Sequence, residues 1–143
     1  MKKITLIVTL IFTMLLSVSC FAGDVPEGLL CTNSAQVYFG KVVSVDNGKI
    51  AVSQTQKVKG VFTEGNVLVY EKFSFFGGDT PKVDETYLCG AIDKNNPLYI
   101  WKTTGTDTKS LKINSDDEMS KRMEQYLNNG EFDKKEQERI ELG

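Results

Sequence analysis

Residues 36–60 of this 143-residue chain read QVYFGKVVSVDNGKIAVSQTQKVKG. Two runs rich in β-branched residues, Gln36–Val45 and Lys49–Val58, flank the dipeptide Asn47-Gly48. Asn-Gly between two such runs is the strongest short-range signal for a β-hairpin, because both residues tolerate the positive φ angles of a two-residue turn. The stretch therefore predicts a long antiparallel hairpin.

The first strand of this hairpin contains a lysine where its alternation requires an apolar residue. Val37, Phe39 and Val43 share one face, and Lys41 falls among them. A bulge at Gly40 would turn the lysine outward, bring the next valine inward and curve the strand. A long, curved first strand is typical of a small barrel.

Three later apolar runs complete the predicted sheet. They are Val67–Tyr70, Thr86–Ile92 and Leu98–Thr103, and Ser110–Ile113 adds a short further run. Val67–Tyr70 is apolar on both faces, so we expect both to be covered. Five strands with a curved first one predict an OB-like Greek-key barrel over residues 23–114.

Residues 115–143 have a different character and predict helices, which makes the overall class α+β. Ser115 and Glu118 form a capping box, and a helical apolar stripe follows and ends near Gly130. Its members are Met119, Met123, Tyr126 and Leu127. A second helix over Asp133–Leu142 has little apolar surface to bury, so we expect it to fray.

The N-terminus predicts an export signal. Lys2 and Lys3 precede the uncharged apolar run Ile4–Val18, which suits a signal peptide and is too short for a spanning helix. Cleavage after Ala22 would give a signal peptide of residues 1–22 and a secreted protein.

Cleavage before Cys20 is the alternative. Ser19-Cys20 resembles the end of the bacterial lipobox, although Ser17 stands where that motif usually has leucine. Acylated Cys20 would then tether the protein to a membrane at the cell surface. Both alternatives remain open at the level of sequence.

Charge and cysteines limit the partners. Lys2 and Lys3 are two of 17 basic residues, and all 19 acidic residues follow the signal, so the exported part has net charge −4. It lacks the basic surface that nucleic-acid binding requires. Because exported chains oxidise their thiols, we expect a disulfide between Cys31 and Cys89, against the alternative of two separate buried thiols.

The residue types present disfavour an enzyme. The chain has no histidine, which excludes Ser-His-Asp and Cys-His nucleophilic sites and histidine-ligated zinc. The acids Asp116, Asp117 and Glu118 are better explained as first-turn helix residues than as calcium ligands. We predict no catalytic residue, no metal and no cofactor.

Aromatic residues are the best candidates for a contact surface. Phe73, Phe75 and Phe76 precede Gly77-Gly78, where a flexible loop at the barrel rim could stack on a sugar or a peptide. Tyr99 and Trp101 share one face of the fifth strand and offer the same two interpretations, binding platform or core. Core is the more frequent role of large aromatic residues.

The chain resembles the netrin-like, or tissue-inhibitor-of-metalloproteinase-like, OB-fold domains over residues 29–103. Three segments carry the resemblance: Ala35–Val42 (AQVYFGKV), Val58-Lys59-Gly60 and Glu85–Leu88 (ETYL). The family's inhibitors chelate the zinc of a metalloproteinase with an N-terminal cysteine in a Cys-X-Cys motif. Here Phe21-Ala22 follows Cys20, so the inhibitory residues do not carry over.

The sequence thus favours an exported, non-enzymatic binding protein whose partner is a protein or glycan at the cell envelope. Inhibition of an extracellular hydrolase such as a metalloproteinase is the alternative.

Overall fold

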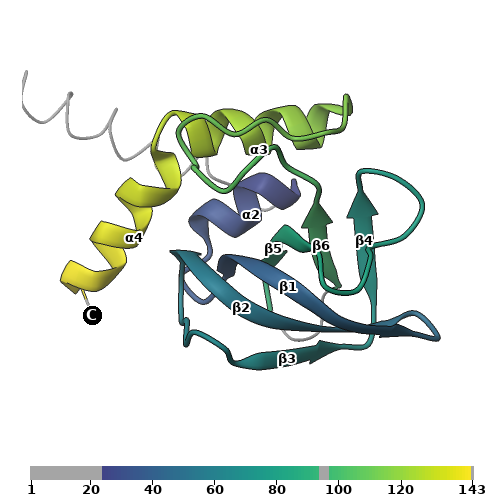
Figure 1. The fold of residues 1–143 in the computed structure, drawn as a ribbon. Helices are drawn as coiled ribbons and strands as arrows, with labels where there is room; N and C mark the ends of the chain where they lie inside the picture. The colour runs from purple at the N-terminus through teal and green to yellow at the C-terminus, as the bar shows by residue number, and fades with distance from the viewer. Residues whose placement is uncertain (1–23, 94–96, 143) are drawn as a thin grey trace, which may run out of the picture.

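The structure is a computed structural model that describes residues 24–93 and 97–142; the predicted signal peptide and Cys20 lie outside these ranges. Its strands form one six-stranded sheet in the order β3-β2-β1-β5-β6-β4, and only β4 and β6 are parallel (Figure 1). The elements are α2 (Val25–Cys31), β1 (Gln36–Asp46), β2 (Lys49–Lys59), β3 (Val67–Tyr70), β4 (Phe73–Phe76), β5 (Thr86–Ala91), β6 (Leu98–Trp101), α3 (Glu118–Asn128) and α4 (Glu131–Leu142).

The predicted hairpin is confirmed. β1 and β2 pair antiparallel through Asp46 and Lys49, and Asn47 and Gly48 both have positive φ angles, 51° and 80°. The bulge expected in β1 at Gly40 was wrong: the register with β2 shifts between Phe39 and Gly40, but the extra residue there is Thr55 of β2, and β1 pairs with β5 without a shift from Gln36 to Lys41. Lys41 follows the regular alternation on the face of Phe39 and is exposed, while Val42 is buried in the same core as Tyr38.

The sheet has a hydrophobic core on each face. One core lies between the sheet and the helices and includes Phe39, Leu88 and Trp101. The other lies on the opposite face, where the curled sheet surrounds Tyr38, Val52 and Ile100, among others. Figure 1 shows α2 and α3 on one side of the sheet, with the edge strand β3 at the part of the curled sheet farthest from α3. The first half of β1, residues 37–40, is buried on both faces because it lies between the two cores, whereas most of its second half is exposed.

The predicted five-stranded closed barrel is not confirmed. Phe73–Phe76, which we expected to lie in an irregular segment, forms the additional strand β4. β4 pairs with β6 and forms one edge of the sheet, while β3 forms the other. The sheet is therefore open and mixed. The part of the fold prediction that is confirmed is a mainly β domain followed by helices.

Two smaller expectations for the strands were wrong. β3 was expected to be covered on both faces, but the side chains of Val67 and Val69 are 49% and 66% exposed because β3 is an edge strand. The run Ser110–Ile113 makes only an isolated bridge, from Ile113 to Thr103.

The predicted amphipathic helix is α3. Met123 and Leu127 are buried, and Met119 and Tyr126 pack against the same core. The N-cap is Asp117, whose carboxylate accepts a hydrogen bond from the Ser120 amide, so the predicted capping box starting at Ser115 was wrong. An N-cap side chain accepts a hydrogen bond from a first-turn backbone amide that has no partner within the helix.

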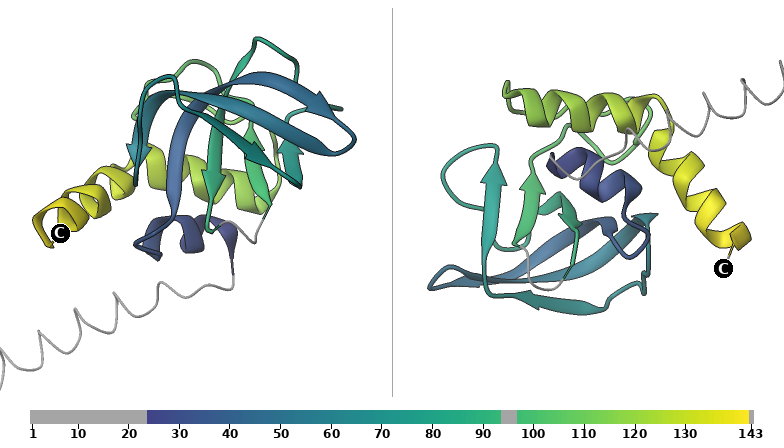
Figure 2. Two further views of the ribbon diagram at one scale, coloured as in Figure 1. Left: turned by 90° about the horizontal axis from the view of Figure 1, so that it is seen from below. Right: turned by 180° about the vertical axis from the view of Figure 1, so that it is seen from behind.

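The expectation that the last helix frays was also wrong. Phe132 at the start of α4 is 1% exposed and belongs to the core beneath the helices. Its ring packs edge-to-face on Tyr126 of α3, with 6.4 Å between the ring centroids. Figure 2 shows that α4 turns away from α3 after this contact. One large buried side chain thus holds the N-terminal end of a mostly polar helix.

Candidate functional site

The aromatic residues proposed as a contact surface lie mostly in the cores. Trp101 is completely buried, and its indole N–H donates to the hydroxyl of Ser120 at 3.1 Å. Phe76 stacks on Trp101 with 5.4 Å between the ring centroids, and Phe75 packs edge-to-face on Tyr87 at 5.2 Å. These contacts are those expected of aromatic residues that supply core area.

Phe73 and Tyr99 are half-buried as well. Tyr99 lies 6.3 Å from Trp101, centroid to centroid, at the boundary of the core beneath the helices, and Phe73 packs against the core on the opposite face. The structure therefore divides the five aromatic residues between the two faces of the sheet rather than gathering them on one platform.

The predicted disulfide between Cys31 and Cys89 is absent. Cys89 is a completely buried free thiol. It belongs to the core on the face away from the helices, whereas Cys31 packs against the core beneath the helices. The sheet separates the two residues, and burial raises the pKa of the Cys89 thiol to about 12.

A different site occurs where the end of β2 meets the end of α2 and one side of α4. A cavity of about 450 Å³ opens there, a size within the range of small-molecule sites. Its lining combines apolar residues, short polar residues and charges: Leu30, Cys31, Asn33, Ser34, Lys59, Lys135, Glu138, Arg139 and Leu142. We call this cavity the Lys59 cleft.

Lys59 is the most unusual residue of the cleft, because only 2% of its surface is exposed. Its ammonium donates a hydrogen bond to the carbonyl oxygen of Thr32 at 2.6 Å. Burial lowers the pKa of Lys59 to about 8; the nearby Glu136 opposes this shift, and Arg139 and Lys135 add to it. At neutral pH the cleft therefore contains a poorly hydrated positive charge.

The other two cations of the cleft already have carboxylate partners. The Arg139 guanidinium binds Glu136 through Nε at 2.6 Å and Nη2 at 3.0 Å. The Lys135 ammonium lies 3.7 Å from a carboxylate oxygen of Glu138. Within the described ranges, Lys59 alone among these three has no ion-pair partner.

Glu136 is the carboxylate that connects α4 to the end of β2 beside the cleft. It accepts hydrogen bonds from the backbone amide of Gly60 at 3.2 Å and from Arg139, and the Lys57 ammonium lies at 2.5 Å. Burial by itself would raise the pKa of Glu136, but these donors outweigh it and lower the pKa to about 2. Glu136 is thus fully committed to structure.

Gly60 allows β2 and α4 to meet in this way. It has a φ of 94°, and a Cβ atom there would lie 2.5 Å from the carbonyl oxygen of Ala35. Only glycine permits both the backbone conformation and the close approach. The chain then leaves β2 with the Gly60 amide directed at Glu136.

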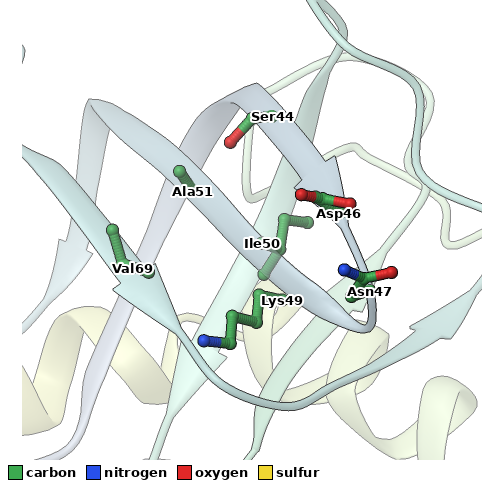
Figure 3. A pocket seen from close by; sticks show the side chains of 7 residues that line it. All are labelled: Ser44, Asp46, Asn47, Lys49, Ile50, Ala51 and Val69. Atoms are coloured by element: carbon green, nitrogen blue, oxygen red, sulfur yellow. The ribbon is translucent and has the colours of Figure 1, made fainter.

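A second, smaller cavity of about 270 Å³ lies near the hairpin turn (Figure 3). Its lining includes Ser44, Ala51 and Val69, from the neighbouring strands β1, β2 and β3, and Figure 3 shows them beside Ile50 and Lys49. Because its lining offers few polar groups besides exposed turn residues, it is a weaker candidate for a ligand site.

The acids at the start of α3 are used for helix capping. Asp117 accepts hydrogen bonds from Ser120 and Ser115; burial tends to raise its pKa, and these bonds lower it overall. No cluster of three or more potential metal-ligating side chains occurs in residues 24–93 and 97–142. None of the helices in the described ranges is long and apolar enough to span a bilayer.

No protein family, characterised protein or solved structure shows significant similarity to this chain. Sequence reasoning did not single out the Lys59 cleft. Its one local signal was a lysine directly after Val58 at the end of a strand, in the segment that ends with Gly60.

Proposed function

We propose that this protein is an exported, non-enzymatic binding protein, and that the Lys59 cleft holds a small amphipathic anion. The observation that carries the proposal is the burial of Lys59. Its side chain lines a cavity, and its ammonium has no carboxylate ion-pair partner among the described residues. A buried charge without a counter-charge is costly, and an entering anion would supply the missing partner.

The chemistry of the lining suggests the class of ligand. Leu30 and Leu142 offer apolar surface, while Lys59 offers charge. Charge-assisted hydrogen bonds from an ammonium to a carboxylate or phosphate oxygen are strong in a partly desolvated site. A medium-chain carboxylate or alkyl phosphate, with its head group at Lys59, fits both requirements.

Binding can be tested with octanoate, with octanol as the uncharged control of equal length. We expect octanoate to shift the amide resonances of Leu30, Ser34 and Leu142 and to raise the pKa of the Lys59 ammonium, and octanol to do neither. Lys59→Met should abolish binding. Lys41→Met, which removes an exposed lysine of β1, should retain it. Equal shifts with both ligands, or no shift at millimolar concentration, would overturn the proposal.

The pH dependence of binding follows from the same group. Because the pKa of Lys59 is about 8 in the unliganded protein, the ammonium loses its proton as the pH rises through this value. The affinity of the unsubstituted protein for octanoate should therefore fall as the pH rises above 8.

Export and location form the second part of the proposal, supported by the N-terminal sequence pattern. A membrane tether through Cys20 and free secretion after Ala22 predict different products. The intact mass of the native protein, measured in membrane and soluble fractions, separates an acylated chain beginning at Cys20 from a soluble chain beginning at Gly23. An uncleaved chain in the cytoplasm would overturn export. A netrin-like relationship also remains a proposal, supported by the hairpin and by the curled sheet with an inner core.

A further inference from the structure

The open edge of β3 is the exposed apolar edge of the sheet. Val67 and Val69 are 49% and 66% exposed, and β3 has β2 on one side and no strand on the other. An unprotected edge of this kind is a template for pairing with another strand.

The hydrogen-bonding groups at this edge can be assigned from the ladder with β2. The amide of Gln54 donates to the carbonyl of Asn66 at 2.9 Å, and Leu68 and Tyr70 face Val52 and Ile50 in register. Bonded pairs alternate in an antiparallel ladder, so Leu68 and Tyr70 bond to β2. Val67 and Val69 therefore direct their amides and carbonyls to the open edge.

We propose that this edge pairs with the β3 edge of a second copy of the chain, antiparallel and centred on Leu68. In this register Val67 of each copy lies opposite Val69 of the other. These are the residues whose backbone groups face outward, so both pairs are hydrogen-bonded pairs, and their exposed side chains become cross-strand neighbours.

Charge at the ends of the strand supports this register. Glu64, in the turn before β3, lies four residues before Leu68, and Lys72, just after β3, lies four residues after it. The symmetric pairing thus brings Glu64 of each copy near Lys72 of the other. Both side chains are exposed and neither has an ion-pair partner within residues 24–93 and 97–142, whereas Glu71 is already paired with Lys49 at 3.2 Å.

Neighbouring registers are less favourable. A shift by two residues is the smallest that keeps outward-facing backbone groups paired. One direction places Val67 opposite Glu71, and the other places Val69 opposite Gly65. Each shifted register keeps one valine pair, Val69 with Val69 or Val67 with Val67, in place of two, and each separates Glu64 from Lys72.

The dimer should be weak. A pair of four-residue strands buries less than the roughly 1,200 Å² typical of stable interfaces, so we expect a dissociation constant on the order of 100 micromolar. Analytical ultracentrifugation of the purified protein over a concentration series would show a monomer–dimer equilibrium. A monomer at all concentrations up to 1 millimolar, about ten times the expected constant, would overturn the proposal.

Charge exchange tests the register directly. Glu64→Lys and Lys72→Glu should each weaken self-association by roughly tenfold, because each places like charges together at both ends of the pair. A mixture of the two variants should associate as heterodimers, and the double variant should recover the original affinity. Lys102→Glu makes the same charge change away from β3 and should have no effect. Failure of the double variant to recover would overturn this pairing.

Two measurements complete the test. Val69→Pro removes an amide that faces the open edge, so it should abolish the dimer while circular dichroism shows the fold retained. In a sample of mixed labelled and unlabelled chains, the α-proton of Leu68 should contact its counterpart in the other copy, as in a non-hydrogen-bonded pair. A dimer without this contact, or association only with a peptide of another protein, would contradict the proposal.

Discussion

Lys59 sits where a polar residue is energetically unfavourable, and this has a measurable consequence for stability. Its pKa of about 8 lies below the ordinary value of 10.5, so the protonated form is less stable in the folded chain than in the unfolded chain. The Thr32 carbonyl that it contacts also accepts a bond from the Ala35 amide at 3.0 Å. Loss of the lysine would therefore leave no orphaned acceptor.

We predict that Lys59→Met leaves the free energy of unfolding unchanged or raises it by about 1–2 kcal/mol, because the buried charge is replaced by an apolar chain of similar length. Urea unfolding at pH 7 measures the change. Lys57→Met, which removes a partner of Glu136, should instead lower the free energy of unfolding. A loss of more than 1 kcal/mol in Lys59→Met would show that its ammonium stabilises the fold.

Cys89 gives a second prediction for a single residue. Since the thiol is completely buried and its pKa is raised to about 12, it should resist alkylation by iodoacetamide in the folded protein and react fully in guanidinium chloride. Mass spectrometry of peptides containing Cys89 distinguishes the two states. Recovery of a peptide in which Cys89 is linked to Cys31 would contradict the structure.

Elements whose partners are close in sequence could be predicted. The hairpin around Asn47-Gly48 and the stripe of α3 depend on local spacing, and both were confirmed. β4 could not be predicted, because its partner β6 follows only after β5 and the phenylalanines alone do not specify a parallel pairing. α4 was misjudged because Phe132 precedes the position where we expected the helix to begin.

The candidate site could not be predicted for a related reason. The Lys59 cleft is made by the end of β2, the end of α2 and one side of α4, three segments far apart in sequence. Nothing in the local pattern of Val58-Lys59-Gly60 indicates that the lysine is buried. Its burial depends on the docking of α4, which the sequence led us to reject.

The docking of α4 gives a prediction for this element. Phe132→Ala should lower the free energy of unfolding by about 3–4 kcal/mol, the usual cost of removing a fully buried phenylalanine. Ile140→Ala, at a position 59% exposed on the same helix, should change it by less than about 0.5 kcal/mol. Thermal or urea unfolding measures both. Equal effects would show that the helix is not held by Phe132.

For the whole molecule, Glu136 and Lys59 predict two windows of pH dependence. The pKa of Glu136 is about 2 in the folded chain and about 4.5 when unfolded, so the unfolded state binds the proton first as the pH falls. Its stabilisation is complete above about pH 4.5 and is lost as the pH falls toward 2. After allowance for solvent screening, this loss is on the order of 1–2 kcal/mol.

Lys59 acts in the opposite direction at high pH. Between about pH 8 and 10.5 the unfolded chain holds the Lys59 proton and the folded chain does not, so this group raises the stability as the pH increases. Unfolding free energies measured from pH 2 to 10.5 check both windows. Glu136→Gln should reduce the change in unfolding free energy between pH 2 and 4.5, and Lys59→Met should reduce the change between pH 8 and 10.5. An unchanged profile in either variant would assign the window to other groups.

The parallel pairing of β4 with β6 has a consequence for the order in which the chain can fold. Phe73 lies opposite Leu98 and Phe76 opposite Trp101, so the partner of β4 is synthesised 25 residues after β4 itself. A chain emerging from a ribosome or a translocation channel can close the β1–β2 hairpin at once. The largely apolar, uncharged segment FSFF cannot pair until β6 has been synthesised, and in that interval it is a site that a chaperone could protect from aggregation.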